Sequence, residues 1–183
     1  IEQIFICFAE TSWMYDYLEI NSWSILQDKI NTFLCFLRER VHIEICANVS
    51  NLIQVDNPIV KKGFYNDLDN LYESYEKNHN QILTIQNFLE KQINPTSKPG
   101  EYIKYNSTEK NCVRLQITKT RSNVLQQKMK NHSEKIILDY GIEFFWKDVQ
   151  FVSSNKTNLE IRFPLCDEVC KNLGSFQSQL NKM

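Results

Sequence analysis

Between residues 64 and 93, apolar side chains recur every three, four or seven positions, with one interruption near Asn78. This spacing places them on one face of an amphipathic helix, as a heptad stripe. At 1.5 Å per residue the helix would be about 45 Å long. Pro95 and the Pro99-Gly100 pair would end it. The stripe consists of Phe64, Leu68, Leu71, Tyr75, Ile82, Ile85, Leu89 and Ile93.

Two further segments show the same helical spacing of apolar residues. One covers residues 23–45, and the other begins at Pro164, a residue favoured in the first helical position, and runs to residue 183. Residues 1–20 are rich in aromatic and apolar side chains, and we predict a helix there as well. Turn-forming residues in 47–60 interrupt the helices around a short extended piece.

Between the helices the period changes to that of strands. Apolar and polar residues alternate over 113–118 and similarly over 102–105, and two further strands are predicted over 149–152 and 159–163. Polar turns at 107–111 and 153–157 join each pair, which predicts two β-hairpins. A short helix is expected near Val124–Met129, and the rest of 122–146 has a mixed pattern.

These elements together predict a mostly α fold with a small β insertion. Because each apolar stripe needs a partner in water, we expect helices 64–93 and 164–183 to pair antiparallel. The strands fall between the two helices in the sequence, which places a small antiparallel sheet at their tip. Glycine and proline are scarce, at four each, and this scarcity also favours long helices.

Charge is unevenly distributed along the chain, although the formal net charge is only −1. Residues 1–100 contain 8 basic and 13 acidic side chains, and residues 101–183 contain 13 basic and 9 acidic ones. Much of the positive charge lies in residues 101–135, with 8 basic and 3 acidic side chains. This arrangement is a modest indication of an anionic partner, and a solvated mixed-charge surface is the alternative interpretation.

The candidate binding residues lie in and after this basic segment. Lys and Arg neutralise phosphates, and Ser and Asn can donate hydrogen bonds to phosphate oxygens. Aromatic side chains are not interleaved with them, so we do not expect base stacking. The candidate nucleic-acid-binding residues are Lys119, Arg121, Ser122, Asn123, Lys128, Lys130 and Lys156.

Motifs for catalysis are missing from the sequence. It has no phosphate-binding loop, no dinucleotide fingerprint and no nucleophile elbow. Asp67 and Asp69 are two residues apart, so they would not face each other on a helix. We predict that this segment has no catalytic residue and holds no cofactor.

The six cysteines and three histidines do not have metal-ligand spacing, and no CxxC pair occurs. Cys166 and Cys170 are four residues apart, and we interpret them as small buried apolar groups, with a thiol pair as the alternative. This cysteine usage favours a reduced, intracellular protein. No apolar run approaches the ~20 residues of a membrane span, so we expect no membrane partner.

Residues 57–71, NPIVKKGFYNDLDNL, resemble a segment of MutS-family DNA mismatch-repair proteins, in which a phrase of this type opens the long lever helix. Residues 115–121, LQITKTR, look like a strand of that family's clamp domain. Residues 162–165, RFPL, resemble the hydrophobic-Pro-Glu-Leu phrase where the chain turns back into a second lever helix, although Pro164-Leu165 lacks the Glu. The resemblance covers residues 23–183.

The resemblance implies a particular organisation. It divides the chain into lever or core helices (1–56), an outgoing lever helix (57–100), a clamp β insertion (101–163) and a returning lever helix (164–183). Long antiparallel lever helices would carry an antiparallel β clamp at their tip. The family's mismatch-reading motif and ATPase module are not recognisable here, so we expect this chain to be an internal fragment.

The function implied is mechanical. The clamp would contact duplex DNA backbone without reading sequence, and the helices would relay its position to a distant ATPase. In the full-length protein the resemblance implies an ATPase that uses ATP and Mg²⁺ and works as a homodimer. Frequent Asn, Lys and Ile suggest an AT-rich genome, which leaves a viral or organellar source open.

A second class of function also fits the heptad stripes. A coiled-coil scaffold, or an arm like those of SMC proteins, would use the apolar helix face to contact other proteins. The hairpins and the basic segment between the helices favour the DNA clamp, since a scaffold would need only a short turn there.

Overall fold

The computed structural model describes residues 23–48, 58–107, 113–130, 134–180 and 182. The helix expected over residues 1–20 and the extended piece within 52–55 lie outside the described residues. The chain divides into two compact units, residues 1–64 and 65–183.

The first unit contains helix α3 (Trp23–Arg40) and the short helix α4 (Ile43–Asn48). The predicted helix over 23–45 is therefore interrupted at Val41 and His42. There the backbone forms a bridge to the segment before the second unit: the His42 N–H donates to the Ile59 carbonyl (2.8 Å). The Lys61 N–H donates to the Arg40 carbonyl (2.7 Å), so two backbone bonds fasten the end of α3 to residues 59–61.

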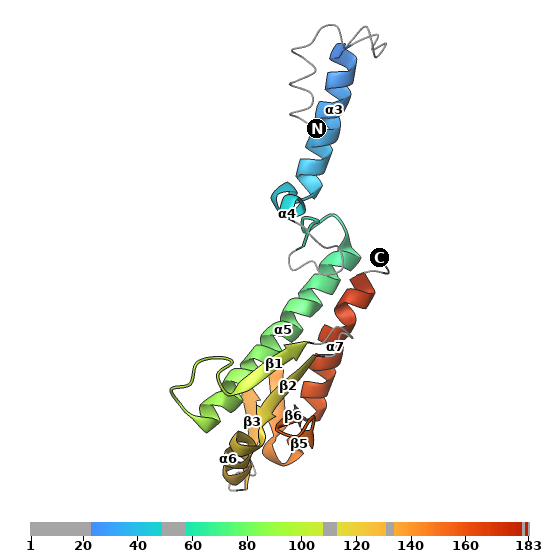
Figure 1. The fold of residues 1–183 in the computed structure, drawn as a ribbon. Helices are drawn as coiled ribbons and strands as arrows, with labels where there is room; N and C mark the ends of the chain where they lie inside the picture. Colours follow the sequence, from blue (N-terminus) through green and yellow to red (C-terminus); the bar gives the residue numbers. More distant parts are fainter. Residues whose placement is uncertain (1–22, 49–57, 108–112, 131–133, 181, 183) are drawn as a thin grey trace. The chain divides into compact units, whose positions relative to one another are not determined.

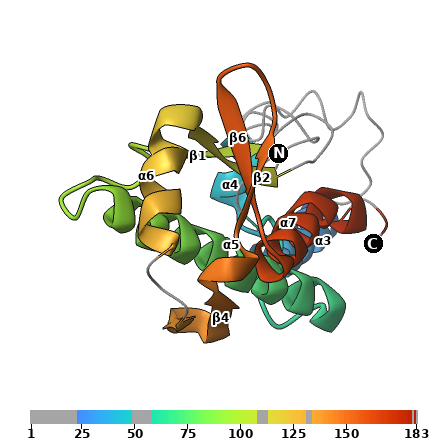
Figure 2. The same cartoon turned by 90° about the horizontal axis from the view of Figure 1, so that it is seen from below.

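In the second unit, helices α5 (Asn66–Ile93) and α7 (Pro164–Leu180) lie side by side, as two perpendicular views show (Figure 1 and Figure 2). Tyr72 and Tyr75 on α5 pack against the ring of Phe176, with centroids 5.4 and 4.3 Å away. Further along α5, Asn78 accepts a hydrogen bond from the Asn172 amide (3.2 Å). Contacts thus move towards the start of α7 as α5 proceeds, so the two helices run antiparallel.

Four strands form one antiparallel sheet in the order β1-β2-β6-β5. The predicted hairpins are both present: β1 (Ile103–Ser107) pairs with β2 (Val113–Thr118), and β5 (Gln150–Ser153) pairs with β6 (Asn158–Arg162). Pairing of β2 with β6, with Leu115 opposite Ile161, joins them.

A second antiparallel pair lies where the sequence pattern was mixed. Strands β3 (Lys135–Leu138) and β4 (Ile142–Phe145) are joined by the turn η1 (Asp139–Gly141), and η2 (Trp146–Asp148) follows. Tyr140 and Gly141 both have positive φ, 60° and 70°, which closes the hairpin within three residues. Helix α6 (Lys119–Met129) follows β2 directly.

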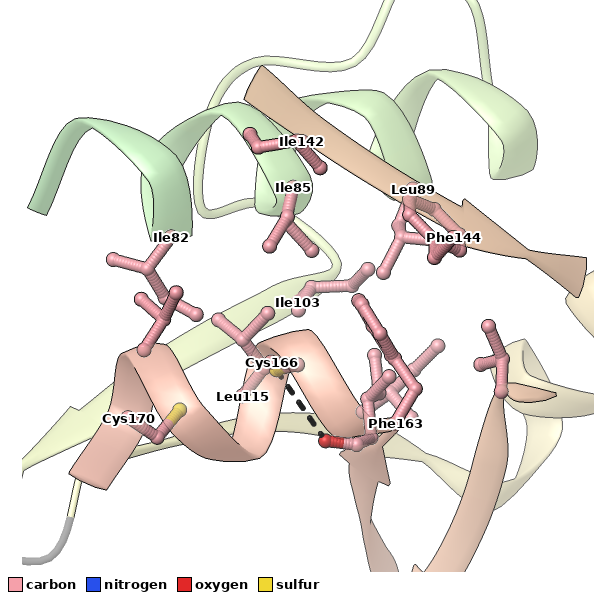
Figure 3. Close-up of a cluster of buried hydrophobic side chains, with 14 of the residues drawn as sticks. Ile82, Ile85, Leu89, Ile103, Leu115, Ile142, Phe144, Phe163, Cys166 and Cys170 are labelled. Carbon is pink, nitrogen blue, oxygen red and sulfur yellow. Dashed lines mark hydrogen bonds between the residues drawn. The ribbon is translucent and has the colours of Figure 1, made fainter. Parts of the chain in front are cut away.

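One core joins the helices to the strands (Figure 3). Ile82, Ile85 and Leu89 of α5 are fully buried beside apolar residues of the sheet. From the other side, α7 contributes Cys166, whose thiol lies 3.9 Å from the Ile161 carbonyl. Each fully buried Leu or Ile stabilises the fold by roughly 1.5–3 kcal/mol.

The predicted architecture, in which long antiparallel lever helices carry an antiparallel β clamp at their tip, is wrong. Figure 1 shows β1 and β2 alongside α5 and α7. The buried residues of α5 all lie between Asn78 and Glu90, in the half covered by the strands. The heptad stripe identifies the apolar face of a helix but not the element that covers it. Strands cover much of that face here, so the stripe does not need a partner helix along its whole length.

No helix of the described part of the chain is both long and apolar enough to cross a membrane.

Candidate nucleic-acid interface

Helix α6 carries most of the predicted binding residues, and it is fixed to the core through one face. Leu125 is fully buried, Ser122 is 1 % exposed, and Met129 is half-buried. These three residues are three or four positions apart, so they form a single strip. Most of the remaining surface of α6 is exposed, and the helix contains no Asp or Glu.

The basic residues of α6 and of its C-cap, Lys130, lie on two flanks of this buried strip. At 100° per residue, Lys119 and Lys130 are about 20° apart around the helix axis, and Arg121 and Lys128 are also about 20° apart. The two pairs are separated by about half a turn. Lys119, Lys128 and Lys130 are exposed, whereas Arg121 is partly buried.

Arg121 is held by its neighbours. Its guanidinium lies 4.5 Å from the centre of the Tyr102 ring, a cation–π contact, and donates a hydrogen bond to the Glu101 carbonyl (3.4 Å). Hydrogen bonds from the Lys98 N–H and from Tyr102 lower the pKa of the Glu101 carboxyl, and the Arg121 charge adds to this effect. Glu101 therefore stays ionised and offsets part of the Arg121 charge.

The loop that supplies Tyr102 is anchored by a buried carboxylate. Glu90, 1 % exposed on α5, accepts hydrogen bonds from the backbone N–H groups of Gly100 (2.9 Å), Tyr102 (3.1 Å) and Ile103 (2.9 Å). Gln86 donates to the Ile103 carbonyl (2.6 Å) beside it. These bonds fix the loop, and Tyr102 with it, next to α6.

Lys156 lies in the β5–β6 turn, and the turn is tied to α6. The Lys119 N–H donates to the Thr157 carbonyl (3.1 Å). Within the turn, the Asn155 side-chain oxygen accepts from the N–H groups of Thr157 (3.0 Å) and Asn158 (2.8 Å). The exposed Lys156 is therefore held near the start of α6.

Six of the seven predicted residues have exposed or partly exposed side chains in this region: Lys119, Arg121, Asn123, Lys128, Lys130 and Lys156. Ser122 does not belong to the surface. Its hydroxyl is buried and donates to the Lys119 carbonyl (2.8 Å), so it closes the first turn of α6.

Sequence reasoning missed Tyr102 and Glu101, which hold Arg121. They precede it by about twenty positions, and no spacing rule connects a loop residue to a helix that distant.

Lys135, another basic residue of the segment, forms a salt bridge with Glu143 across the β3–β4 pair.

Metal-ligating and thiol side chains do not form a second candidate site in the described residues. No cluster of three or more His, Cys, Asp or Glu that could hold a metal ion occurs among them. Cys166 and Cys170 are 0 % and 2 % exposed, which confirms their burial. Their mutual hydrogen bond, together with burial, raises the pKa of the Cys166 thiol, so this group stays protonated.

Comparison with known proteins does not place the chain in a family: no protein-family model matches it, and no curated protein matches it.

Proposed function

We propose that this chain binds the backbone of duplex DNA, without reading its sequence, as part of a MutS-like mismatch-repair protein. The main support for the proposal is helix α6, an element without any carboxylate, which together with its C-cap residue presents the exposed Lys119, Lys128 and Lys130. Lys156 extends this surface from the neighbouring turn.

The physical basis is the release of counterions from DNA. Each phosphate neutralised by Lys or Arg releases a condensed cation. For each such contact, the logarithm of the binding constant therefore falls by about 0.9 when the logarithm of the salt concentration rises by one. Four or five contacts are consistent with non-specific dissociation constants of about 10⁻⁴–10⁻⁶ M. Affinity in this range suits a surface that holds DNA only together with other parts of a larger assembly.

The resemblance of residues 57–71 to the mismatch-repair family supports duplex DNA as the particular polyanion. In this proposal the ATPase, with ATP and Mg²⁺, and the contacts of a homodimer belong to other parts of a longer protein. This chain contributes phosphate contacts and no catalysis.

A charge-reversal experiment on the 183-residue chain tests the proposal. One variant carries Lys119→Glu, Lys128→Glu and Lys130→Glu. A matched control carries Lys29→Glu, Lys77→Glu and Lys171→Glu, three exposed lysines on α3, α5 and α7 with the same total charge change. Binding is followed by fluorescence anisotropy of a labelled random-sequence duplex at several salt concentrations.

We expect the α6 variant to lose binding and its salt dependence, and the control to keep most of both. Equal loss in both variants would indicate a response to net charge alone and would remove α6 as the site. Wild-type protein without measurable affinity for duplex DNA would overturn the proposal and favour the scaffold alternative.

A further inference from the structure

The surface of α6 divides into three strips besides the one that is buried. Lys119 and Lys130 lie on one flank, and Arg121 and Lys128 lie on the other. Opposite the buried strip is a ridge formed by Thr120, Val124 and Gln127, all exposed. The ridge has no charged side chain, and it separates two lines of positive charge.

This arrangement differs from that of a helix that rests on a single DNA strand. Such a helix would place its cations along the exposed apex, where they approach one row of phosphates. On α6 the apex carries instead an exposed aliphatic side chain, Val124 (37 % exposed), between a hydroxyl and an amide. Two rows of cations with an uncharged ridge between them complement two rows of phosphates with a groove between them.

The diameter of the helix, compared with the widths of the nucleic-acid grooves, indicates which groove α6 fits. A helix with its side chains is about 10–12 Å across, and the major groove of B-form DNA is about 12 Å wide and 8.5 Å deep. The minor groove of B-form DNA is too narrow for a helix, as is the deep major groove of A-form RNA. The opposite side of α6 is fixed to the core by Leu125, so the ridge faces outward.

We infer that α6 enters the major groove of B-form DNA, with its two basic flanks on the phosphates of opposite strands and its ridge towards the base edges. This inference rests on the proposed DNA binding and deepens it. It names the groove and adds Thr120, Val124 and Gln127 as contact residues. Lys156, in the turn that is bonded to the start of α6, would add a further phosphate contact.

The first test blocks the groove on the DNA side. The 183-residue chain is titrated with two duplexes of one sequence, one of which carries a 5-glucosyl-hydroxymethyl group on every cytosine. The sugar fills the major groove and leaves the phosphates unchanged. We expect the modified duplex to bind about tenfold more weakly or worse. Equal binding of the two duplexes would overturn the groove inference and leave the proposed function standing, whereas binding of neither would overturn both.

The second test blocks the groove on the protein side. Gln127→Trp adds bulk to the ridge without a change in charge, and Asn70→Trp adds the same bulk at an exposed position of α5. We expect Gln127→Trp to weaken binding of the unmodified duplex about tenfold and Asn70→Trp to leave it unchanged. Far-ultraviolet circular dichroism verifies that both variants keep the wild-type helix content. A folded Gln127→Trp variant with wild-type affinity would overturn the inference.

Discussion

Glu90 is the buried charge on which the loop beside α6 depends. Its two oxygens accept three backbone N–H groups, and a carboxylate is removed from water at low cost only when it is satisfied in this way. The three N–H groups depend equally on Glu90, because Gly100, Tyr102 and Ile103 lie where the chain leaves helix α5 and enters strand β1.

We therefore predict that Glu90→Ala lowers the free energy of unfolding by about 3 kcal/mol or more, since each buried N–H left without a partner costs about 1–3 kcal/mol. Urea denaturation measures the change. Glu76→Ala, at an exposed position on the same helix, is the control and should stay within about 0.5 kcal/mol of wild type. A loss for Glu90→Ala no larger than that of the control would show that water satisfies the loop instead.

Tyr105 provides a prediction about pH. Burial, with smaller effects from Tyr75 and Cys170, raises its pKa from 10.0 to about 12. Because the folded protein holds this proton more tightly than the unfolded chain, the associated stability is fully present below pH 10. It is lost as pH rises from 10 towards 12.

Urea denaturation across that pH range should thus show a decline in wild-type stability that is shallower in Tyr105→Phe. Some decline should remain in the variant, because burial also raises the pKa of Tyr72. Tyr65→Phe, at a residue 57 % exposed, serves as the control with an unchanged slope. Identical slopes for wild type and Tyr105→Phe would contradict the assignment.

At the scale of elements, α6 depends on its contacts more than on its own sequence. Its 11 residues are fewer than the ~12–15 that an isolated helix needs in water. Its only fully buried apolar side chain is Leu125. Tertiary packing through that residue therefore keeps α6 folded, and with it the spacing of the basic flanks.

Leu125→Ala should accordingly destabilise α6 in particular. We expect a loss of about 2–5 kcal/mol of unfolding free energy and faster amide hydrogen exchange in residues 119–129 than in α5. DNA affinity should fall although no charge is removed. Val124→Ala, one position away and exposed, is the control for stability and exchange. Unchanged exchange in α6 of Leu125→Ala would show that other contacts hold the helix.

Elements with a clear period could be predicted from the sequence. Helices α5 and α7 and both hairpins of the main sheet follow from spacings of three, four or two residues. The β3–β4 pair was missed because Ile137 is apolar yet 67 % exposed, which hides the alternation. Its turn depends on a positive φ at Tyr140, a conformation that a bulky residue rarely adopts and that no local pattern signals.

The candidate DNA-contact site was also only partly predictable from the sequence. Clustered Lys and Arg residues indicated the segment, but not its two flanks, which depend on which face of α6 is buried. Ser122 illustrates the difference. It lies three residues before Leu125 and so shares the buried face, an inference that requires α6 to begin at Lys119 and not near Val124.

At the scale of the molecule, the two units differ in how much apolar surface they bury. Every buried apolar side chain in the described residues lies between Ile82 and Phe176, within the unit 65–183. In contrast, Ile25, Phe33 and Phe36 on α3 are about half exposed, at 56 %, 51 % and 48 %. A single core that spans α5, α7 and both sheets has what a domain needs to fold on its own.

We predict that a fragment of residues 65–183 folds cooperatively and keeps the DNA affinity of the whole chain. All the proposed contact residues and the core that holds them lie inside this unit, and cooperative unfolding requires only that core. Thermal unfolding by circular dichroism, with anisotropy titration of the same duplex, measures both properties. The Leu125→Ala change made in the fragment is the control, and it should lower the melting temperature and the affinity as it does in the full chain. A fragment that unfolds without a cooperative transition would show that residues 1–64 complete the core. One that folds but fails to bind would place essential DNA contacts in the first unit.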